Sequence, residues 1–339
     1  GANVDDFCRA GDNSKKKWLE IKEKLDAAYK WGARRTGGFR FVGHDVYQHD
    51  NMEITTDQDF YIETLTDLEI PEDRYRQPDL DLTEKEKTMV RGLLGGLLWT
   101  AVSTQMLLAA RVGILLSELS AIGKMSVARE AQELLGELRR NPTKVHYCRI
   151  PTASHWQEVT FAALGDCAHL NRPKGGSTGG FLGLCGGPEL AKGETAKCSI
   201  MAWRSWRLER AAIGTNDGEV QSVVVAEDML YRMRLLWAEF HGAQADDVDY
   251  YRRANNEVKC VPGVLGTDSK GGYDAIHLNE SANLGLSNAR AAVQAYQLKE
   301  NILRDETLLL WIAGDWNLSD ALTKKSAECR QGLLLFLKT

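Results

Sequence analysis

The sequence predicts an α/β fold in which a mixed five-stranded sheet flanked by helices is preceded by a smaller, helix-rich α+β lobe. Three observations favour this class. The chain has 339 residues, more than one compact core usually fills, so two domains are expected. Hydrophobic residues at 43% and charged residues at 26% are ordinary values for a globular protein. The apolar pattern changes near residue 150, from mostly helical to an alternation of strands and helices.

The first lobe is predicted from helical spacing and from one short alternating segment. Residues 14–31 carry apolar side chains at helical spacing, which indicates an amphipathic helix. Residues 39–55 alternate as strands and predict a hairpin that turns at His49-Asp50-Asn51. Thr83 and Glu86 have the spacing of a capping box and begin a long helix.

A domain boundary is expected where this helical layer ends. The layer continues to Arg140, and Asn141-Pro142 then breaks it. We therefore expect residues 1–150 and 151–339 to form the two domains.

The second domain is predicted to alternate between strands and helices. The stretch 175–187 is rich in Gly, but its glycines do not follow a strand and open a helix as a phosphate loop requires, so we assign it to turns. The predicted strands are 159–164, 179–184, 198–203, 261–267 and 307–313, and the predicted helices are 219–241, 287–303 and 319–337.

Composition excludes several other classes of protein. The seven cysteines are odd in number and lack CxxC spacing, so we expect reduced thiols in an intracellular protein, cytoplasmic or nuclear. The most apolar stretch, 93–119, is interrupted by polar residues, which predicts a buried helix pair and no membrane partner. The histidines have no ligand spacing that would predict zinc. The chain starts with Gly1-Ala2 and no leader, and we expect it to be a piece of a longer protein.

Four acids are the candidate chemical groups. Asp166 and Asp268 are predicted at the ends of two strands, and Glu219 and Asp320 in the first turns of two helices. Strand ends and helix starts gather side chains into one crevice of an open sheet, so these carboxylates are expected to converge. Four carboxylates suit Mg²⁺ or Mn²⁺, and two such ions would hold the attacking water and the leaving oxygen of a phosphodiester.

A structural role is the alternative for each acid taken alone. Asp320 and Glu219 have positions in which an acid stabilises a helix N-terminus. Asp166 and Asp268 have positions in which an acid forms a turn, and Asp268-Ser269 has the form of a cap for a following helix. The order and context of the four acids favour the metal site.

The residues around these acids form a recognisable series. It comprises Gly165-Asp166-Cys167-Ala168, Ser177-Thr178-Gly179-Gly180, Ala202-Trp203-Arg204-Ser205-Trp206, Gly218-Glu219-Val220-Gln221, Gly266-Thr267-Asp268-Ser269, and Asp315-Trp316-Asn317-Leu318-Ser319-Asp320-Ala321-Leu322-Thr323-Lys324. With this series, residues 155–339 resemble the ribonuclease H domain of copia-type LTR retrotransposon Pol polyproteins.

The resemblance implies a fold, an activity, a cofactor and partners. The fold would be ribonuclease H-like. The activity would be hydrolysis of the RNA strand of RNA/DNA hybrids, with two Mg²⁺ or Mn²⁺ ions. Asp166, Glu219, Asp268 and Asp320 would be both the catalytic residues and the metal ligands. The partners would be the hybrid and the remainder of the Pol polyprotein.

Upstream segments extend the resemblance to the C-terminal end of reverse transcriptase. Val4-Asp5-Asp6-Phe7 resembles the end of the polymerase catalytic loop, although Asn3 stands where the family usually has an aromatic residue. Phe39-Arg40-Phe41-Val42-Gly43 resembles a later palm strand, and 99–120 resembles helices that follow the thumb. The fingers and the first palm aspartate are absent, so polymerase activity is not expected from this chain.

One departure from the family's pattern supports an alternative function. In Gly214-Thr215-Asn216-Asp217-Gly218 the family favours Ser and Ala. Gly costs about 1 kcal/mol relative to Ala inside a helix, and Asp217 is expected to add negative charge beside the metal site. The alternative is therefore a catalytically inactive or domesticated nucleic-acid-binding or scaffold module that retains the fold.

Basic residues have two interpretations. A net charge of −5 means that local basic patches must carry any binding to nucleic acid. Arg204, Arg207 and Arg210 alternate with Trp203 and Trp206, which suits contacts to phosphates and sugars. A solvated strand edge with the Trp side chains packed inward fits the pattern equally well.

Overall fold

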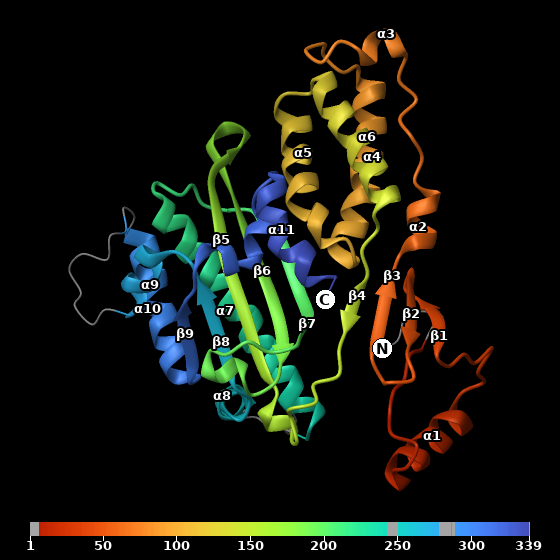
Figure 1. The fold of residues 1–339 in the computed structure, drawn as a ribbon, viewed down its shortest axis with the longest axis vertical. Helices are drawn as coiled ribbons and strands as arrows, with labels where there is room; N and C mark the ends of the chain where they lie inside the picture. Colours follow the sequence, from red (N-terminus) through yellow and green to blue (C-terminus); the bar gives the residue numbers. More distant parts are fainter. Residues whose placement is uncertain (1–6, 243–249, 278–285, 287–288, 339) are drawn as a thin grey trace.

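The computed structural model describes residues 7–242, 250–277, 286 and 289–338. The first lobe contains a four-stranded antiparallel sheet in the order β1-β2-β3-β4, formed by β1 (Gly38–Phe41), β2 (His44–Gln48), β3 (Ile54–Asp57) and β4 (Val145–Tyr147). The predicted hairpin is confirmed in β2 and β3. Strand β4 was not predicted, and it carries the chain from the lobe to the second sheet (Figure 1). Of the segment that resembles the polymerase loop, Val4, Asp5 and Asp6 lie outside the described residues.

The helical layer of the lobe follows the prediction closely. It comprises α2 (Asp59–Thr64), α3 (Glu72–Tyr75), α4 (Glu84–Ser103), η1 (Met106–Leu108), α5 (Ala109–Ala121) and α6 (Met125–Arg140), while α1 (Lys16–Ala28) has no buried residue. The capping box is confirmed, because Thr83 N–H donates to Glu86 Oε2 at 2.7 Å and Glu86 N–H donates to Thr83 Oγ1 at 3.3 Å.

The second sheet confirms the predicted fold class, a mixed five-stranded sheet flanked by helices. Its order is β7-β6-β5-β8-β9, with β5, β6 and β7 antiparallel and with β8 and β9 parallel to β5. The strands are β5 (Thr160–Arg172), β6 (Gly176–Gly186), β7 (Cys198–Arg207), β8 (Gly263–Thr267) and β9 (Thr307–Trp311).

Helices and short 3-10 turns complete this part of the chain. They are η2 (Trp156–Glu158), η3 (Pro173–Gly175), η4 (Leu190–Lys192), α7 (Thr215–Phe240), α8 (Tyr250–Lys259), α9 (Lys270–His277), α10 (Ala289–Arg304), η5 (Gly314–Trp316), η6 (Leu318–Leu322) and α11 (Ala327–Phe336). Helix α8 was not predicted.

Three predicted boundaries are wrong. Strand β5 does not end near residue 164 but runs to Arg172. The strand predicted at 179–184 is confirmed within β6, but the assignment of the glycine-rich stretch to turns is wrong, because the buried strand runs from Gly176 to Gly186. The predicted helix 319–337 is divided into η6 and α11. The first two errors share a cause, since a strand covered on both faces does not show the alternation that marks a half-exposed strand.

The five-stranded sheet is covered on both faces. A cluster that includes Phe161, Val223 and Leu298 joins one face to α7 and α10. A second cluster extends from the lobe helices through Leu182 and Ile200 of the sheet to Leu333 of α11. Figure 1 shows the lobe helices beside α11. The two sheets therefore share no strand-to-strand hydrogen bonds in the described ranges, but they share a hydrophobic core. The division into two domains at residue 150 stays a prediction.

No helix in the described ranges is long and apolar enough to span a bilayer. No disulfide joins the seven cysteines, all of which lie in those ranges.

Arg234 connects α7 to the parallel half of the sheet. Its side chain is 1% exposed. Nε donates to the Val261 carbonyl at 2.7 Å, Nη1 to Thr307 Oγ1 at 2.8 Å and Nη2 to the Asp305 carbonyl at 2.7 Å. Replacing this side chain would leave buried carbonyl groups without donors, and such groups are costly.

We expect Arg234→Met to lower the free energy of unfolding by about 3 kcal/mol, because up to three hydrogen bonds from a charged donor are lost in the core. The matched control is Arg232→Met two residues earlier, where the side chain is exposed and forms a surface ion pair of 3.4 Å with Asp228. That control should change the free energy of unfolding by less than about 0.5 kcal/mol. Urea unfolding measures both values, and equal effects would contradict the structural role of Arg234.

Candidate metal centre

The four predicted acids come from four separate elements. Asp166 lies within β5 rather than at its end, with its side chain buried. Glu219 is the fifth residue of α7, Asp268 directly follows β8, and Asp320 lies in η6 rather than at the start of the last helix. The five-stranded topology brings these elements together where β8 ends beside the central strand β5.

The structure brings three of the acids together directly. One carboxylate oxygen from each of Asp166, Glu219 and Asp268 lies within 4.8 Å of the other two. Asp320 is outside this group but contacts Asp166, whose pKa it helps to raise. Glu219 Oε2 is buried and has no hydrogen-bond partner among the residues that the structure describes.

Burial and crowding change the acidity of two of these groups. Burial first, and then repulsion from Asp320, raises the pKa of Asp166 to about 7. Burial, with repulsion from Asp166 and Asp268, raises the pKa of Glu219 to about 9. In the absence of a cation, the folded protein therefore binds protons that ordinary carboxyl groups would release.

Two glycines allow α7 to lie close to β5. A Cβ atom on Gly165 would lie 3.1 Å from the Val223 Cα atom of α7. A Cβ atom on Gly218 would lie 2.5 Å from Cys167 Sγ of β5. The close approach places Glu219, which follows Gly218, beside Asp166. Gly218 thus has a packing role in the segment where the sequence departs from the family's pattern.

Asp217 has a different role from the one that the sequence suggested. Its side chain is 1% exposed, and its Oδ2 accepts a hydrogen bond from Gly214 N–H at 3.2 Å. The carboxylate therefore stabilises the N-terminus of α7. It is not among the three acids that lie together.

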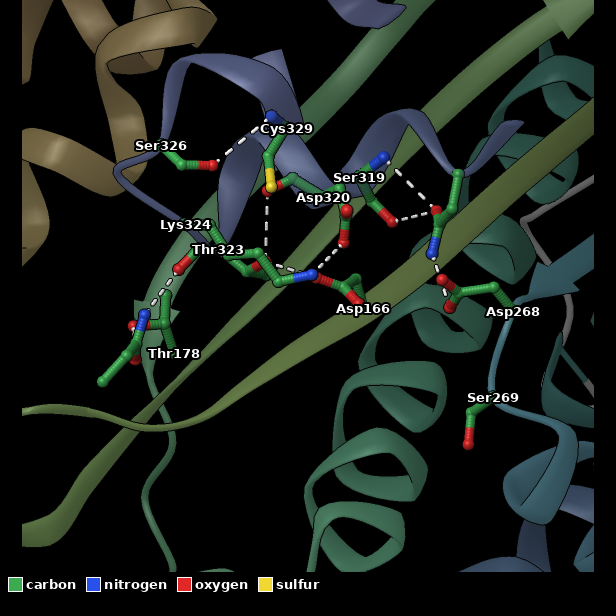
Figure 2. A network of polar contacts seen from close by, with 12 residues as sticks. Asp166, Thr178, Asp268, Ser269, Ser319, Asp320, Thr323, Lys324, Ser326 and Cys329 are labelled. Atoms are coloured by element: carbon green, nitrogen blue, oxygen red, sulfur yellow. Dashed lines mark hydrogen bonds and ion pairs between the residues drawn. The ribbon is translucent and has the colours of Figure 1, made fainter. Parts of the chain in front are cut away.

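Three polar residues that the sequence analysis gave no role hold the acids in place. Asn317 is 3% exposed, and its Nδ2 donates to Asp268 Oδ1 at 2.9 Å. The Thr323 hydroxyl donates to Asp166 Oδ2 (Figure 2). The Trp311 indole donates to the Asp268 carbonyl at 3.0 Å. Asn317 and Thr323 belong to the 315–324 motif, but only their contacts identify what they do.

Lys324 places a positive charge among the acids. Its Nζ lies 2.5 Å from Asp320 Oδ1 and 3.9 Å from Asp166 Oδ2 (Figure 2). Although burial lowers the pKa of Lys324, the charges of Asp166 and Asp320 raise it above that of an ordinary lysine. The ammonium group therefore offsets part of the negative charge of the cluster.

The donor set fits a hard divalent cation. Mg²⁺ and Mn²⁺ prefer carboxylate oxygens, and the cluster supplies oxygens from three acids within 4.8 Å of one another. A bound cation would also give the buried Glu219 Oε2 the partner that it lacks. No thiolate or imidazole takes part in the group, so the ligand chemistry is that of Mg²⁺ or Mn²⁺ rather than zinc.

No protein-family model and no curated protein matches the chain. Solved structures to which it is similar include LC11-RNase H1, which was isolated from compost by a metagenomic approach. The two chains are 10% identical, with a TM-score of 0.29, and the match covers 48% of this chain and 92% of that chain. The foamy viral protease-reverse transcriptase in complex with RNA/DNA hybrid is 14% identical, with a TM-score of 0.28. The match covers 61% of this chain and 27% of that chain. The native Prototype Foamy Virus protease-reverse transcriptase is 10% identical, with a TM-score of 0.29. The match covers 62% of this chain and 26% of that chain.

The chain thus spans about a quarter of the length of the foamy-virus chains. The fold class rests on the order and the directions of the strands in the five-stranded sheet.

The free energy of unfolding of the metal-free protein should fall as the pH rises from about 4 towards about 9. The unfolded carboxyl groups titrate near pH 4, whereas the pKa values of Asp166 and Glu219 in the folded protein are about 7 and about 9. Between these limits the unfolded chain binds fewer protons than the folded one, so raising the pH favours unfolding. Urea unfolding at several pH values in EDTA measures how the free energy of unfolding depends on pH. Glu219→Gln should make this dependence weaker, and adding Mg²⁺ should oppose the loss of stability at high pH. A parent curve as flat as that of the variant would exclude the crowded cluster.

Gly218→Ala should separate α7 from β5 and weaken divalent-metal binding. The added Cβ has no room beside Cys167 Sγ, so Glu219 should move away from Asp166. We expect a loss of metal affinity within the 10–100-fold range that disturbed support of a metal ligand gives. Isothermal titration with Mn²⁺ measures the affinity.

Gly92→Ala in α4 is the matched control, because among the described residues no atom beyond its chain neighbours and its own helix backbone lies within 4 Å of the added Cβ. That control should leave metal affinity unchanged and stabilise the helix by up to about 1 kcal/mol. Unchanged Mn²⁺ affinity in Gly218→Ala would argue against the close-packing role.

Proposed function

We propose that the chain is an endonuclease that hydrolyses the RNA strand of RNA/DNA hybrids. Two divalent ions, Mg²⁺ or Mn²⁺, would be held by the catalytic residues Asp166, Glu219, Asp268 and Asp320. The observation that carries the proposal is the convergence of three carboxylates from β5, α7 and the end of β8, with Glu219 Oε2 buried and without a partner. The motifs around the four acids, which resemble those of ribonuclease H domains, add the substrate class.

Each acid has a place in this proposal. Asp166, Glu219 and Asp268 would hold the cations directly, and Asp320 would complete the set from η6, where it contacts Asp166. Divalent cations bound here would activate a water molecule and stabilise the leaving oxygen of the phosphodiester. The protein itself would supply no nucleophile.

The chain's own polar groups would orient the ligands. The hydrogen bonds from Asn317 to Asp268 and from Thr323 to Asp166 fix the carboxylate planes. Such partners of metal ligands restrict their rotation and so preserve the geometry of the site. The Lys324 ammonium group would help to neutralise negative charge when a phosphate enters.

The wider context is also part of the proposal. We infer that the chain belongs to a copia-type retrotransposon Pol polyprotein, with residues 1–150 as the C-terminal remnant of reverse transcriptase. Its partners would then be the hybrid and the rest of the polyprotein, which would carry the fingers and palm. Polymerase activity is not proposed for this chain.

Lys324 favours a second candidate, a catalytically inactive nucleic-acid-binding or scaffold module. Its ammonium group contacts Asp320 and lies near Asp166, so the cluster is partly neutralised without a metal. The raised pKa of Glu219, about 9, removes more negative charge through protonation. A folded protein that never binds a cation is consistent with both features.

Cleavage of a labelled RNA/DNA hybrid with Mg²⁺ or Mn²⁺ separates the two candidates. Asp268→Asn removes one charge and one strong ligand while keeping the side chain's size. We expect it to reduce cleavage by more than about 100-fold, the upper end of the loss that a supporting partner of a metal ligand gives. Relief of carboxylate repulsion should keep the variant folded in metal-free buffer.

Asp315→Asn is the matched control, an exposed acid in η5 that lies outside the cluster. This variant should cleave at the parent rate. Equal cleavage by Asp268→Asn and the parent would mean that another site or a contaminating nuclease acts. Absence of cleavage by the folded parent would favour the scaffold.

A further inference from the structure

A pocket lies between the lobe and the five-stranded sheet, away from the acids. Its volume is about 300 Å³, and its polar lining comprises Ser117 and Ser120 of α5, Lys174 of the β5–β6 turn and Arg207 at the end of β7. Figure 1 shows the β5–β6 turn beside α5. Both parts of the molecule therefore contribute to the pocket.

The pocket is cationic, and its charges are not balanced by nearby acids. Among the described residues, none of Arg172, Lys174 and Arg207 forms an ion pair with a carboxylate. The acid whose charge acts on Arg172 is Glu118. Glu118 itself accepts hydrogen bonds from Lys325 at 3.0 and 2.9 Å, so its charge is already paired.

Arg172 lies beside this pocket as a buried charge without a counter-ion. Its side chain is 6% exposed. It donates to the Gly113 carbonyl at 2.7 Å, to Ser117 Oγ at 3.0 Å and to Thr178 Oγ1 at 2.8 Å, all of which are neutral groups. Its Nη2 is buried and has no hydrogen-bond partner within the described part of the chain. Burial lowers the pKa of Arg172 to about 10, and repulsion from Arg207 adds to the shift, but the group remains charged at neutral pH.

A buried cation of this kind is costly unless an anion compensates it. Ser117 connects Arg172 to the pocket, since its hydroxyl accepts from Arg172 and also lines the pocket. An anion in the pocket would be attracted by all three cations and would meet the hydroxyl of Ser120, because the Ser117 hydroxyl already donates to the Gly113 carbonyl at 3.1 Å. The pocket thus suits a ligand that is compact, anionic and a strong acceptor, as a phosphate is.

Strand register places this pocket on the same face of the sheet as Asp166. Arg207 pairs with Thr178, and Asp166 pairs with Gly180, two residues further along β6. Residues that are two positions apart on one strand project to the same face, and directly paired residues share that face. The rise along β6 and the spacing from β5 to β7 put Arg207 about 12 Å from Asp166, a span of a few nucleotides along a strand.

We infer that this pocket, formed by Ser117, Ser120, Lys174 and Arg207 beside Arg172, binds a phosphate group. Assigning that phosphate to the backbone of a nucleic-acid strand whose other end reaches the acids rests on the proposed function. A chain with a net charge of −5 needs such a local cationic site to hold a polyanion. Free phosphate is the other source of the same chemistry.

The experiment compares Arg207→Ala with the parent in two arms. In EDTA, which prevents cleavage, Arg207→Ala should bind an RNA/DNA hybrid about 5- to 10-fold more weakly at roughly 0.1 M salt, and the slope of log Kd against log salt should decrease by about one. In the second arm, inorganic phosphate exchanged for chloride at constant ionic strength should raise the melting temperature of the parent more than that of Arg207→Ala.

Arg204→Ala is the matched control. Arg204 is an exposed arginine on the same strand, but it pairs with Phe181 and therefore projects to the opposite face from Arg207. It should retain the parent's salt slope and its response to phosphate.

The outcomes separate the sources of phosphate and the two proposals. A phosphate effect without any change in hybrid binding would assign the pocket to free phosphate. If Arg207→Ala binds the hybrid more weakly and the parent never cleaves it, the phosphate-binding pocket would be supported and the nuclease activity would be rejected. If Arg207→Ala equals the parent in both hybrid binding and the response to phosphate, the proposed phosphate-binding pocket is wrong, whether or not the parent cleaves.

Discussion

The distance between α7 and the five-stranded sheet is the constraint on which the candidate centre depends. Near the acids, Gly165 and Gly218 allow backbone and side chain to meet where a Cβ atom would not fit. Further along the helix, a Cβ on Gly263 would lie 2.8 Å from the Arg234 side chain, so a glycine also makes room for the buried guanidinium. Glycines in the sheet and the helix thus set the height of α7 over β5 and β8 along its length, and with it the position of Glu219.

Close packing gathers negative charge that the fold must tolerate. Burial and mutual repulsion raise the pKa values of Asp166 and Glu219, which means that the ionised cluster opposes folding when no cation is bound. The short segment from Asn317 to Lys324 offsets part of this repulsion with two hydrogen-bond donors and one ammonium group. The segment therefore orients the acids and compensates their charge.

The N-terminal lobe has a role beyond covering one face of the sheet. Lys325 forms ion pairs of 2.9 and 3.0 Å with Glu118 and Glu130, and Arg330 forms one of 2.9 Å with Glu137, so residues before and within α11 are tied to α5 and α6. The pairing of Glu118 with Lys325 also leaves Arg172 without a counter-ion. The contact between lobe and sheet that stabilises the fold thereby also leaves the cationic pocket available for an anion.

The sequence by itself determined the elements whose pattern is local. Thr83 and Glu86 predicted the start of α4, and the alternating residues around His44–Gln48 predicted the hairpin, because capping and alternation depend on near neighbours. The fold class followed from the order of elements. The four acids could be named from their motifs, although the positions of Asp166 within β5 and of Asp320 in η6 were not predicted.

Tertiary structure decided the features that depend on what lies opposite a residue. The strand at 179–184 was predicted, but the glycines of β6 lack side chains, so the full length of this buried strand was not, and only the approach of neighbouring elements explains these glycines. Gly218 was counted among the departures that favour an inactive module because its cost to a helix is local, whereas its benefit comes from Cys167 on a distant strand. The roles of Asn317, Thr323 and Arg172 were likewise hidden, because hydrogen bonding and uncompensated charge are properties of partners far apart in the sequence.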